Sequence, residues 1–130
     1  MSKKEHMIEI LQGMGYTPVI DDEGDLMMCY QMKNLFLNVD EDENYVCIVC
    51  SRFERINEGE EGVALATCNK VTRELRLCKA FVNSDFKFVS ASCEFYYAND
   101  ESLMYSLKKS LWMLGFIKRE YQKYKKDMQA

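Results

Sequence analysis

The sequence predicts an α+β domain in which helices pack on an antiparallel sheet of about five strands. Apolar residues recur at helical spacing in three segments, and between these segments they alternate with the two-residue period of strands. The expected order along the chain is α-β-β-β-α-β-β-α, in which helices cover a sheet built from neighbouring strands. A length of 130 residues suits a single domain over residues 1–130.

The first helix is expected over residues 3–14, which carry one apolar stripe formed by Met7, Ile10, Leu11 and Met14. Ser2 is a suitable N-cap, and Glu5 lies where it would complete a capping box. The short apolar run at residues 17–20 contains Pro18, which cannot donate a backbone hydrogen bond. This run is therefore expected to be at best an edge strand.

The next part of the chain predicts a three-stranded antiparallel meander. Alternating apolar residues mark strands at residues 26–30, 35–39 and 45–53. The acidic, glycine-containing segment 21–25 precedes the first of them, and a second acidic segment at 40–44 separates the last two. Short polar side chains and glycine favour turns.

The second half begins with a helix expected over residues 63–75, whose stripe is Ala64, Cys68, Val71 and Leu75. Strands at residues 77–83 and 86–98 follow, and the two polar residues between them predict a hairpin. The sheet is therefore a meander plus a hairpin.

Composition and charge limit the classes of function. The N-terminus is polar and no apolar run approaches 20 residues, so neither a signal peptide nor a membrane span is predicted. A cytoplasmic protein with six reduced cysteines that act as small buried hydrophobes is expected. Residues 20–62 hold twelve acidic and three basic side chains, whereas residues 103–130 hold seven basic and two acidic ones. The acidic first half argues against nucleic-acid binding, which needs a basic face.

Catalytic, metal and cofactor sites are not predicted. Cys47-Ile48-Val49-Cys50 resembles a redox or zinc motif, but positions three apart in a strand point to opposite faces, so the thiols diverge. His6 is the only histidine and is expected at the surface of a short, frayed helix. The acidic segment 21–25 lacks the glycine and glutamate spacing of an EF-hand, leaving a weak divalent contact or plain solvated turns as alternatives.

The last helix, expected from about residue 101 to near the C-terminus with Asn99 or Asp100 as its cap, is apolar on two sides. One side should be core and holds Leu103, Leu107, Leu111, Leu114, Ile117 and Tyr121. The opposite side holds Tyr105, Trp112 and Phe116, with Lys109 among the flanking basic residues. Either the helix is sandwiched within the monomer, or this second stripe is a protein interface, where aromatics beside Arg or Lys are typical.

Three blocks of the sequence resemble the YbjN family, a bacterial group with the type III secretion chaperone-like fold. They are residues 24–30 with 35–42, residues 66–73 with 79–82, and Glu94-Phe95-Tyr96 running into the last helix. The resemblance spans about residues 5–120. It implies a regulator loosely described as acting in sensory transduction, or a dimeric chaperone, and it implies no catalytic residues.

The sequence thus favours a non-catalytic protein-binding, chaperone-like or regulatory module, expected as a homodimer that contacts a further protein partner through sheet and helix surfaces. The alternative is a small-molecule sensor with an apolar pocket, lined by Met and Tyr, between the sheet and the helices.

Overall fold

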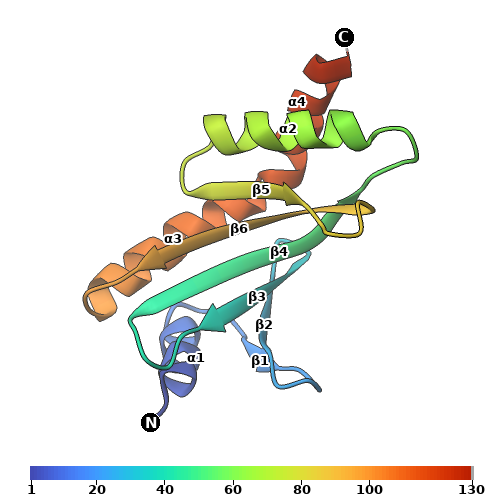
Figure 1. Ribbon diagram of the computed structural model, residues 1–130. Coiled ribbons are helices and arrows are strands. Elements are labelled where there is room, and N and C mark those ends of the chain that lie inside the picture. Colours follow the sequence, from blue (N-terminus) through green and yellow to red (C-terminus); the bar gives the residue numbers. More distant parts are fainter. Residues whose placement is uncertain (130) are drawn as a thin grey trace.

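The computed structural model describes residues 1–129, which form four helices and one six-stranded sheet (Figure 1). The elements in chain order are α1 (Lys3–Gly13), β1 (Val19–Ile20), β2 (Leu26–Tyr30), β3 (Lys33–Val39), β4 (Tyr45–Arg55), α2 (Glu61–Glu74), β5 (Cys78–Val82), β6 (Phe88–Tyr96), α3 (Asp100–Gly115) and α4 (Ile117–Gln129). The predicted α+β class is confirmed. The structure adds one strand and one helix to the predicted order.

All strand pairs of the sheet are antiparallel, in the order β1-β2-β3-β4-β6-β5. The meander of β2, β3 and β4 and the hairpin of β5 and β6 are as predicted, and β6 joins the hairpin to β4. The additional strand is β1, a two-residue edge strand that directly follows Pro18. Proline has no backbone N–H to donate to a neighbouring strand, so its position beside the outermost strand of the sheet is the expected one.

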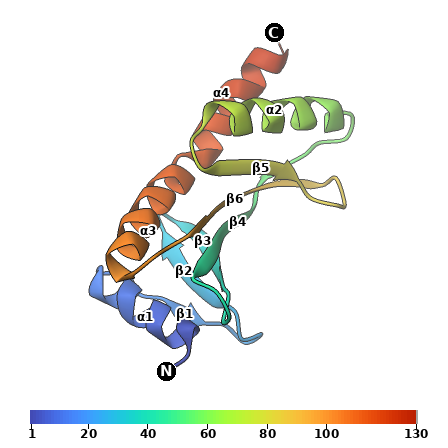
Figure 2. The same cartoon turned by 60° about the vertical axis from the view of Figure 1, so that its left-hand side comes forward.

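The core lies between one face of the sheet and the helices. In Figure 1, α3 runs along the sheet behind β6, and Figures 1 and 2 both place α1 at the end of the molecule near β1 and α2 beside β5. The inward residues of α3 and α4 are fully buried, as predicted: Leu103, Leu107, Leu111, Leu114, Ile117 and Tyr121. They meet buried strand residues such as Val46, Ile48 and Val89. No helix within residues 1–129 has the length and apolar content that crossing a bilayer requires.

The predicted single C-terminal helix is wrong, because the chain breaks it into α3 and α4. The break lies at Gly115, where the helix passes the turn between β2 and β3. A Cβ atom at Gly115 would come within 2.7 Å of the Gln31 side chain, and the Lys33 ammonium donates to the Gly115 carbonyl at 3.2 Å. Glycine weakens a helix interior by about 1 kcal/mol relative to alanine, so it is the favoured place for this break. Gly115 was the feature of the sequence that could have predicted this break.

The helix caps agree with the sequence in part. The Ser2 hydroxyl accepts a hydrogen bond from the Glu5 amide at 3.0 Å, but within the described chain no hydrogen bond returns from the Ser2 amide to the Glu5 side chain, so the predicted capping box is only half formed. The amides of Lys3 and Lys4 donate to the Glu41 carboxylate at 2.9 and 3.1 Å. At α3, Asn99 is the N-cap, and it forms a reciprocal capping box with Ser102. Both helices therefore begin at well-defined residues.

Candidate functional site

The outward side of α3 presents the second stripe that the sequence predicts. We call it the aromatic face of α3 and define it by six residues: Tyr105, Lys108, Lys109, Trp112, Phe116 and Arg119. Tyr105 is 65% exposed and Trp112 is 55% exposed, whereas Leu111, next to Trp112 in the chain, is 0% exposed. Phe116 is half-buried at the α3–α4 break. The exposed rings are not part of the core of this chain.

The rings of the aromatic face are held by their neighbours. Trp112 and Phe116 meet edge to face with centroids 5.0 Å apart. The Arg119 guanidinium lies 4.7 Å from the Phe116 centroid, and the Lys109 ammonium lies 5.6 Å from the Tyr105 centroid. Such contacts are worth about 0.5–1 kcal/mol each at exposed sites. Side chains ordered in this way lose less entropy when they enter a contact.

The charge of this region is of one sign. Between residues 102 and 119 the sequence contains no Asp or Glu, and its basic residues are Lys108, Lys109, Lys118 and Arg119. Among the described residues, none of these four cations lies in a salt bridge, whereas Lys79, Lys123 and Lys125 all do. The aromatic face therefore offers apolar contact and unneutralised positive charge together.

A hollow of about 360 Å³ lies beside the aromatic face, between the end of α1 and α3. Met14 and Tyr16 line it from the α1 side, and Met104, Tyr105 and Lys108 line it from α3. The Tyr16 ring packs edge to face on Tyr30, with centroids 6.1 Å apart. The sequence assigned Met14 to the stripe of α1 and gave no indication that the two helix surfaces meet here.

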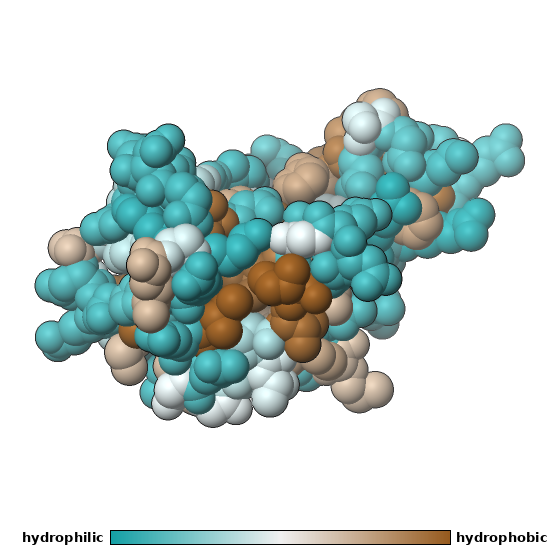
Figure 3. All heavy atoms as spheres, turned by 90° about the horizontal axis from the view of Figure 1, so that it is seen from below, coloured by the Kyte–Doolittle hydropathy of each residue, from teal (hydrophilic) through white to brown (hydrophobic). Residues whose placement is uncertain are grey.

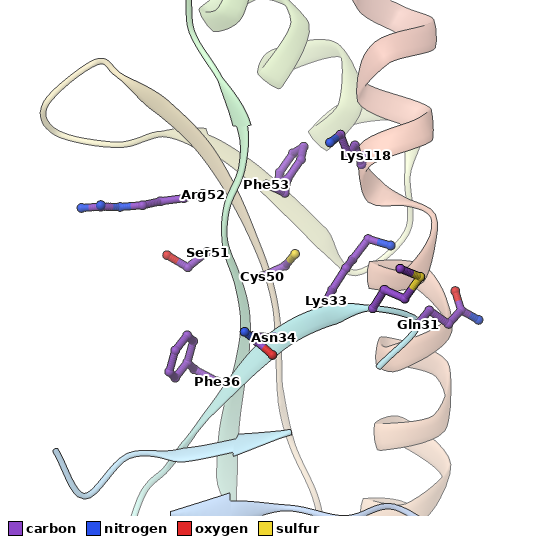
Figure 4. Close-up of a pocket in the computed structure, with 10 residues that line it drawn as sticks. Gln31, Lys33, Asn34, Phe36, Cys50, Ser51, Arg52, Phe53 and Lys118 are labelled. Carbon is purple, nitrogen blue, oxygen red and sulfur yellow. The ribbon is translucent and has the colours of Figure 1, made fainter. Parts of the chain in front are cut away.

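A hollow of about 540 Å³ lies where β3 and β4 separate (Figure 4). Three basic residues line it without any carboxylate, which resembles an anion site. However, Figure 4 shows Lys33 and Lys118 on one side of β4 and Arg52 pointing away on the other. The Arg52 guanidinium instead lies 5.3 Å from the Phe88 ring. The cations do not converge, so this hollow makes no anion-binding constellation.

A second exposed apolar surface, which the sequence did not indicate, lies between α2 and β5. Leu65, Phe81 and Phe86 are exposed and line a hollow of about 500 Å³. Thr72 of α2 closes the outer edge of β5, because its hydroxyl accepts from the Ala80 amide at 2.9 Å and lies 3.2 Å from the Ala80 carbonyl. A closed strand edge cannot take up a further strand at this point.

The cysteines lie as the strand geometry predicts. Cys50 is buried in the core, and Cys47 is half-buried on the other face of the sheet, so the two thiols of the motif diverge. Burial raises the pKa of both thiols, and it raises the pKa of Cys68 to about 11. Protonated thiols are poor nucleophiles. The expectation that the cysteines are buried is wrong for Cys29, which is exposed.

His6 lies at the surface as predicted, with 38% of its side chain exposed, but the side chain has a partner. Its Nε2 atom lies 2.8 Å from an Asp100 carboxylate oxygen. This contact joins α1 to the first turn of α3. It was not predictable because the two residues lie 94 positions apart. Ser2, which also lines the small hollow there, uses its hydroxyl to cap α1.

The acidic segment 21–25 forms the tight turn between β1 and β2. Asp21 accepts hydrogen bonds at 2.9 Å from the amides of Glu23 and Asp25, and Gly24 has a positive φ of 84°. The side chains of Asp22, Glu23 and Asp25 point into solvent. Within residues 1–129 no three His, Cys, Asp or Glu side chains gather in an arrangement suited to a metal ion.

The space between the sheet and the helices is filled by core side chains. Buried residues from every layer occupy it, among them Met7, Met28, Leu37, Ile48 and Leu107. The hollows described above all open to solvent. None of the hollows described above in residues 1–129 is an enclosed apolar pocket between the sheet and the helices.

Comparison with known proteins identifies the fold. No family model and no curated protein matches the sequence. Among solved structures, YbjN from E. coli, described as a proposed transcription regulator, superposes with a TM-score of 0.69 at 8% identity over 87% of this chain and 86% of YbjN. The HopA1–SchA chaperone–effector complex superposes with a TM-score of 0.56 at 15% identity over 87% of this chain and 91% of the matched chain. The predicted resemblance is confirmed at the level of the fold: the chain has the type III secretion chaperone-like fold that YbjN also has.

Proposed function

We propose that this chain is a non-catalytic protein-binding module, either regulatory or chaperone-like, that binds through the aromatic face of α3. The observation that carries this proposal is the exposure of Tyr105 and Trp112 on a helix whose other side is completely buried. Exposed aromatic rings beside unpaired Arg and Lys are the composition of interface hot spots.

The states of the histidine and of the buried thiols support the non-catalytic part of the proposal. The only histidine is engaged with Asp100, and burial raises the pKa of Cys47, Cys50 and Cys68. The similar folds point the same way, because one belongs to a proposed regulator and the other to a chaperone–effector complex. We place the protein in the cytoplasm, where six unpaired cysteines stay reduced.

The proposal is tested with three baits: the wild-type chain, Trp112→Ala, and Met128→Ala. The last variant is the control, because Met128 is exposed on α4, outside the aromatic face. Light scattering measures self-association, and quantitative mass spectrometry measures the proteins retained by each bait. We expect binding to fall at least tenfold for Trp112→Ala and to be unchanged for Met128→Ala. Equal binding by all three baits, in a folded state, would refute the assignment of this face.

A further inference from the structure

We propose that a second copy of this chain covers the aromatic face of α3, and that it does so with its own acidic hairpin. The acidic hairpin is residues 19–25, comprising β1 and the turn that follows it. This inference rests on the proposed function and names the partner of the same site. Each copy would give its hairpin to the other, so that the contact forms twice in a closed two-fold dimer.

The acidic hairpin is the complement of the aromatic face in both charge and hydrophobicity. Val19 and Ile20 are 49% and 46% exposed, an unusual state for two consecutive aliphatic residues in a strand. Beside them, Asp22, Glu23 and Asp25 lie in no salt bridge among the described residues. Figure 3 views the end of the molecule at which α1 and β1 lie, and it shows hydrophobic atoms gathered in the middle of a largely hydrophilic face.

The hairpin has a fixed shape before binding. The two hydrogen bonds accepted by Asp21 hold the turn, and the Lys4 ammonium donates to the Gly24 carbonyl at 2.7 Å, which ties the turn to α1. Lys4 binds a backbone oxygen there and not a carboxylate. The three outer carboxylates are thus presented on a rigid support, which lowers the entropy lost on association.

The other acidic turn is a weaker complement. In residues 40–43 the Glu41 carboxylate already accepts from the first amides of α1 at 2.9 and 3.1 Å, and Asp40 accepts from the amides of its own turn. Only Asp42 and Glu43 remain unengaged there. The hairpin at 19–25 presents three unengaged carboxylates together with two exposed aliphatic side chains, so it is the favoured occupant.

The two surfaces lie close enough on one molecule for a reciprocal contact. Tyr16 lines the hollow beside Tyr105, and β1 begins only three residues later at Val19. The chain therefore passes the edge of the aromatic face at Tyr16, shortly before it enters the hairpin. Apolar contact supplies the affinity of such a pairing, and the opposite charges fix its register and favour this partner over others.

The experiment is a charge-swap complementation followed by light scattering. One variant is Lys108→Glu with Lys109→Glu, and the other is Asp22→Lys with Glu23→Lys. All four side chains are exposed and lie in no salt bridge of the described chain, so both variants should keep the fold. The control, Arg76→Glu with Lys87→Glu, makes the same charge change as the first variant at exposed sites outside both surfaces.

We expect the wild type and the control to have twice the mass of the 15.3 kDa chain. Each swap variant alone should be a monomer, with its dimer dissociation constant raised at least tenfold. An equimolar mixture of the two swap variants should recover the dimer, because both contacts of the mixed pair again join opposite charges.

A monomeric wild type, a dimer that neither swap weakens, or a mixture that stays monomeric would each overturn this inference. Loss of the dimer in the control variant would overturn it as well. The proposed function would survive these outcomes if Trp112→Ala still lost a bound protein partner, and it would fail separately if Trp112→Ala changed no binding at all.

Discussion

Leu111 and Trp112 are consecutive on α3 but lie on opposite sides of it, so they separate the contribution of the core from that of the aromatic face. Leu111 is 0% exposed, and Trp112 is 55% exposed. We expect Leu111→Ala to reduce stability strongly and leave association intact. Trp112→Ala should do the reverse.

The magnitudes follow from burial. Replacing a fully buried leucine by alanine costs about 2–5 kcal/mol, because contacts are lost and a cavity remains. Just under half of the Trp112 surface is buried within this chain. A tryptophan can bury roughly 250 Å², so about 110 Å² is buried here, which is worth about 2–3 kcal/mol at about 25 cal/mol per Å². Alanine keeps part of this contact and favours the helix by about 0.5 kcal/mol. The net loss for Trp112→Ala should be about 1 kcal/mol.

Urea unfolding followed by circular dichroism measures both effects. With an m-value of about 1.5 kcal/mol per M, Leu111→Ala should lower the midpoint by about 2 M and Trp112→Ala by less than about 1 M. The protein concentration must lie below the dimer dissociation constant, because association stabilises the folded state. If Trp112→Ala lowers the midpoint as much as Leu111→Ala, the ring belongs to the core and the reasoning on this face is refuted.

Three further predictions concern the sheet and a helix cap. Lys79, and then the Tyr45 hydroxyl, lower the pKa of the Glu94 carboxyl below 4.5, so its stabilising effect is present above that pH and is lost as the pH falls through the lower folded value. The side chains of Lys79 and Glu94 are both more than one-third exposed, so their interaction is weakened by solvent. The free energy of unfolding of Glu94→Gln should therefore be at most about 1 kcal/mol below that of the wild type at pH 7, and equal to it near pH 2. A difference between the two proteins that grows as the pH falls would contradict the predicted direction of the pKa shift. Thr72→Val removes the bonds to Ala80 and should cost about 1–2 kcal/mol and increase aggregation measured by light scattering, whereas unchanged solubility would show that this edge needs no closure. Asn99→Ala removes the cap of α3 and should cost about 1 kcal/mol in thermal unfolding, and no change would mean that the cap is not needed for α3.

The fold was largely predictable because its signals are local. Alternation in β2, β3 and β4 and the stripes of α2 and α3 depend only on neighbouring residues, and each corresponds to an observed element. The break at Gly115 was missed because the apolar stripe continues through it. The stripe continues because α4 also packs on the core, as the burial of Ile117 and Tyr121 shows. Glycine at position 115 was a better guide than the periodicity.

The candidate site was predictable only in part. Helical spacing placed Tyr105, Trp112 and Phe116 on one side of α3 and separated them from the core residues. Contacts between distant segments gave no such signal. The pairing of His6 with Asp100, and the hollow that α1 forms beside Tyr105, depend on how α1 docks on α3, which no local pattern encodes.

The separation of charge along the chain connects the fold with the proposed dimer. The fold brings part of the acidic first half and the basic tail together, because the Lys125 ammonium lies 3.9 Å from a Glu54 carboxylate oxygen and 3.5 Å from a Glu60 one. It leaves Asp22 and Glu23 on one surface and Lys108 and Lys109 on another, all without ion-pair partners in residues 1–129. Exposed ion pairs add little stability within a monomer, about 0–1 kcal/mol each, so folding does not require that they form. Between two molecules the same charges steer encounter and select orientation, and this effect weakens as salt is added. The dimer should therefore dissociate more readily at 500 mM than at 50 mM salt, whereas the urea midpoint of the monomer should change little.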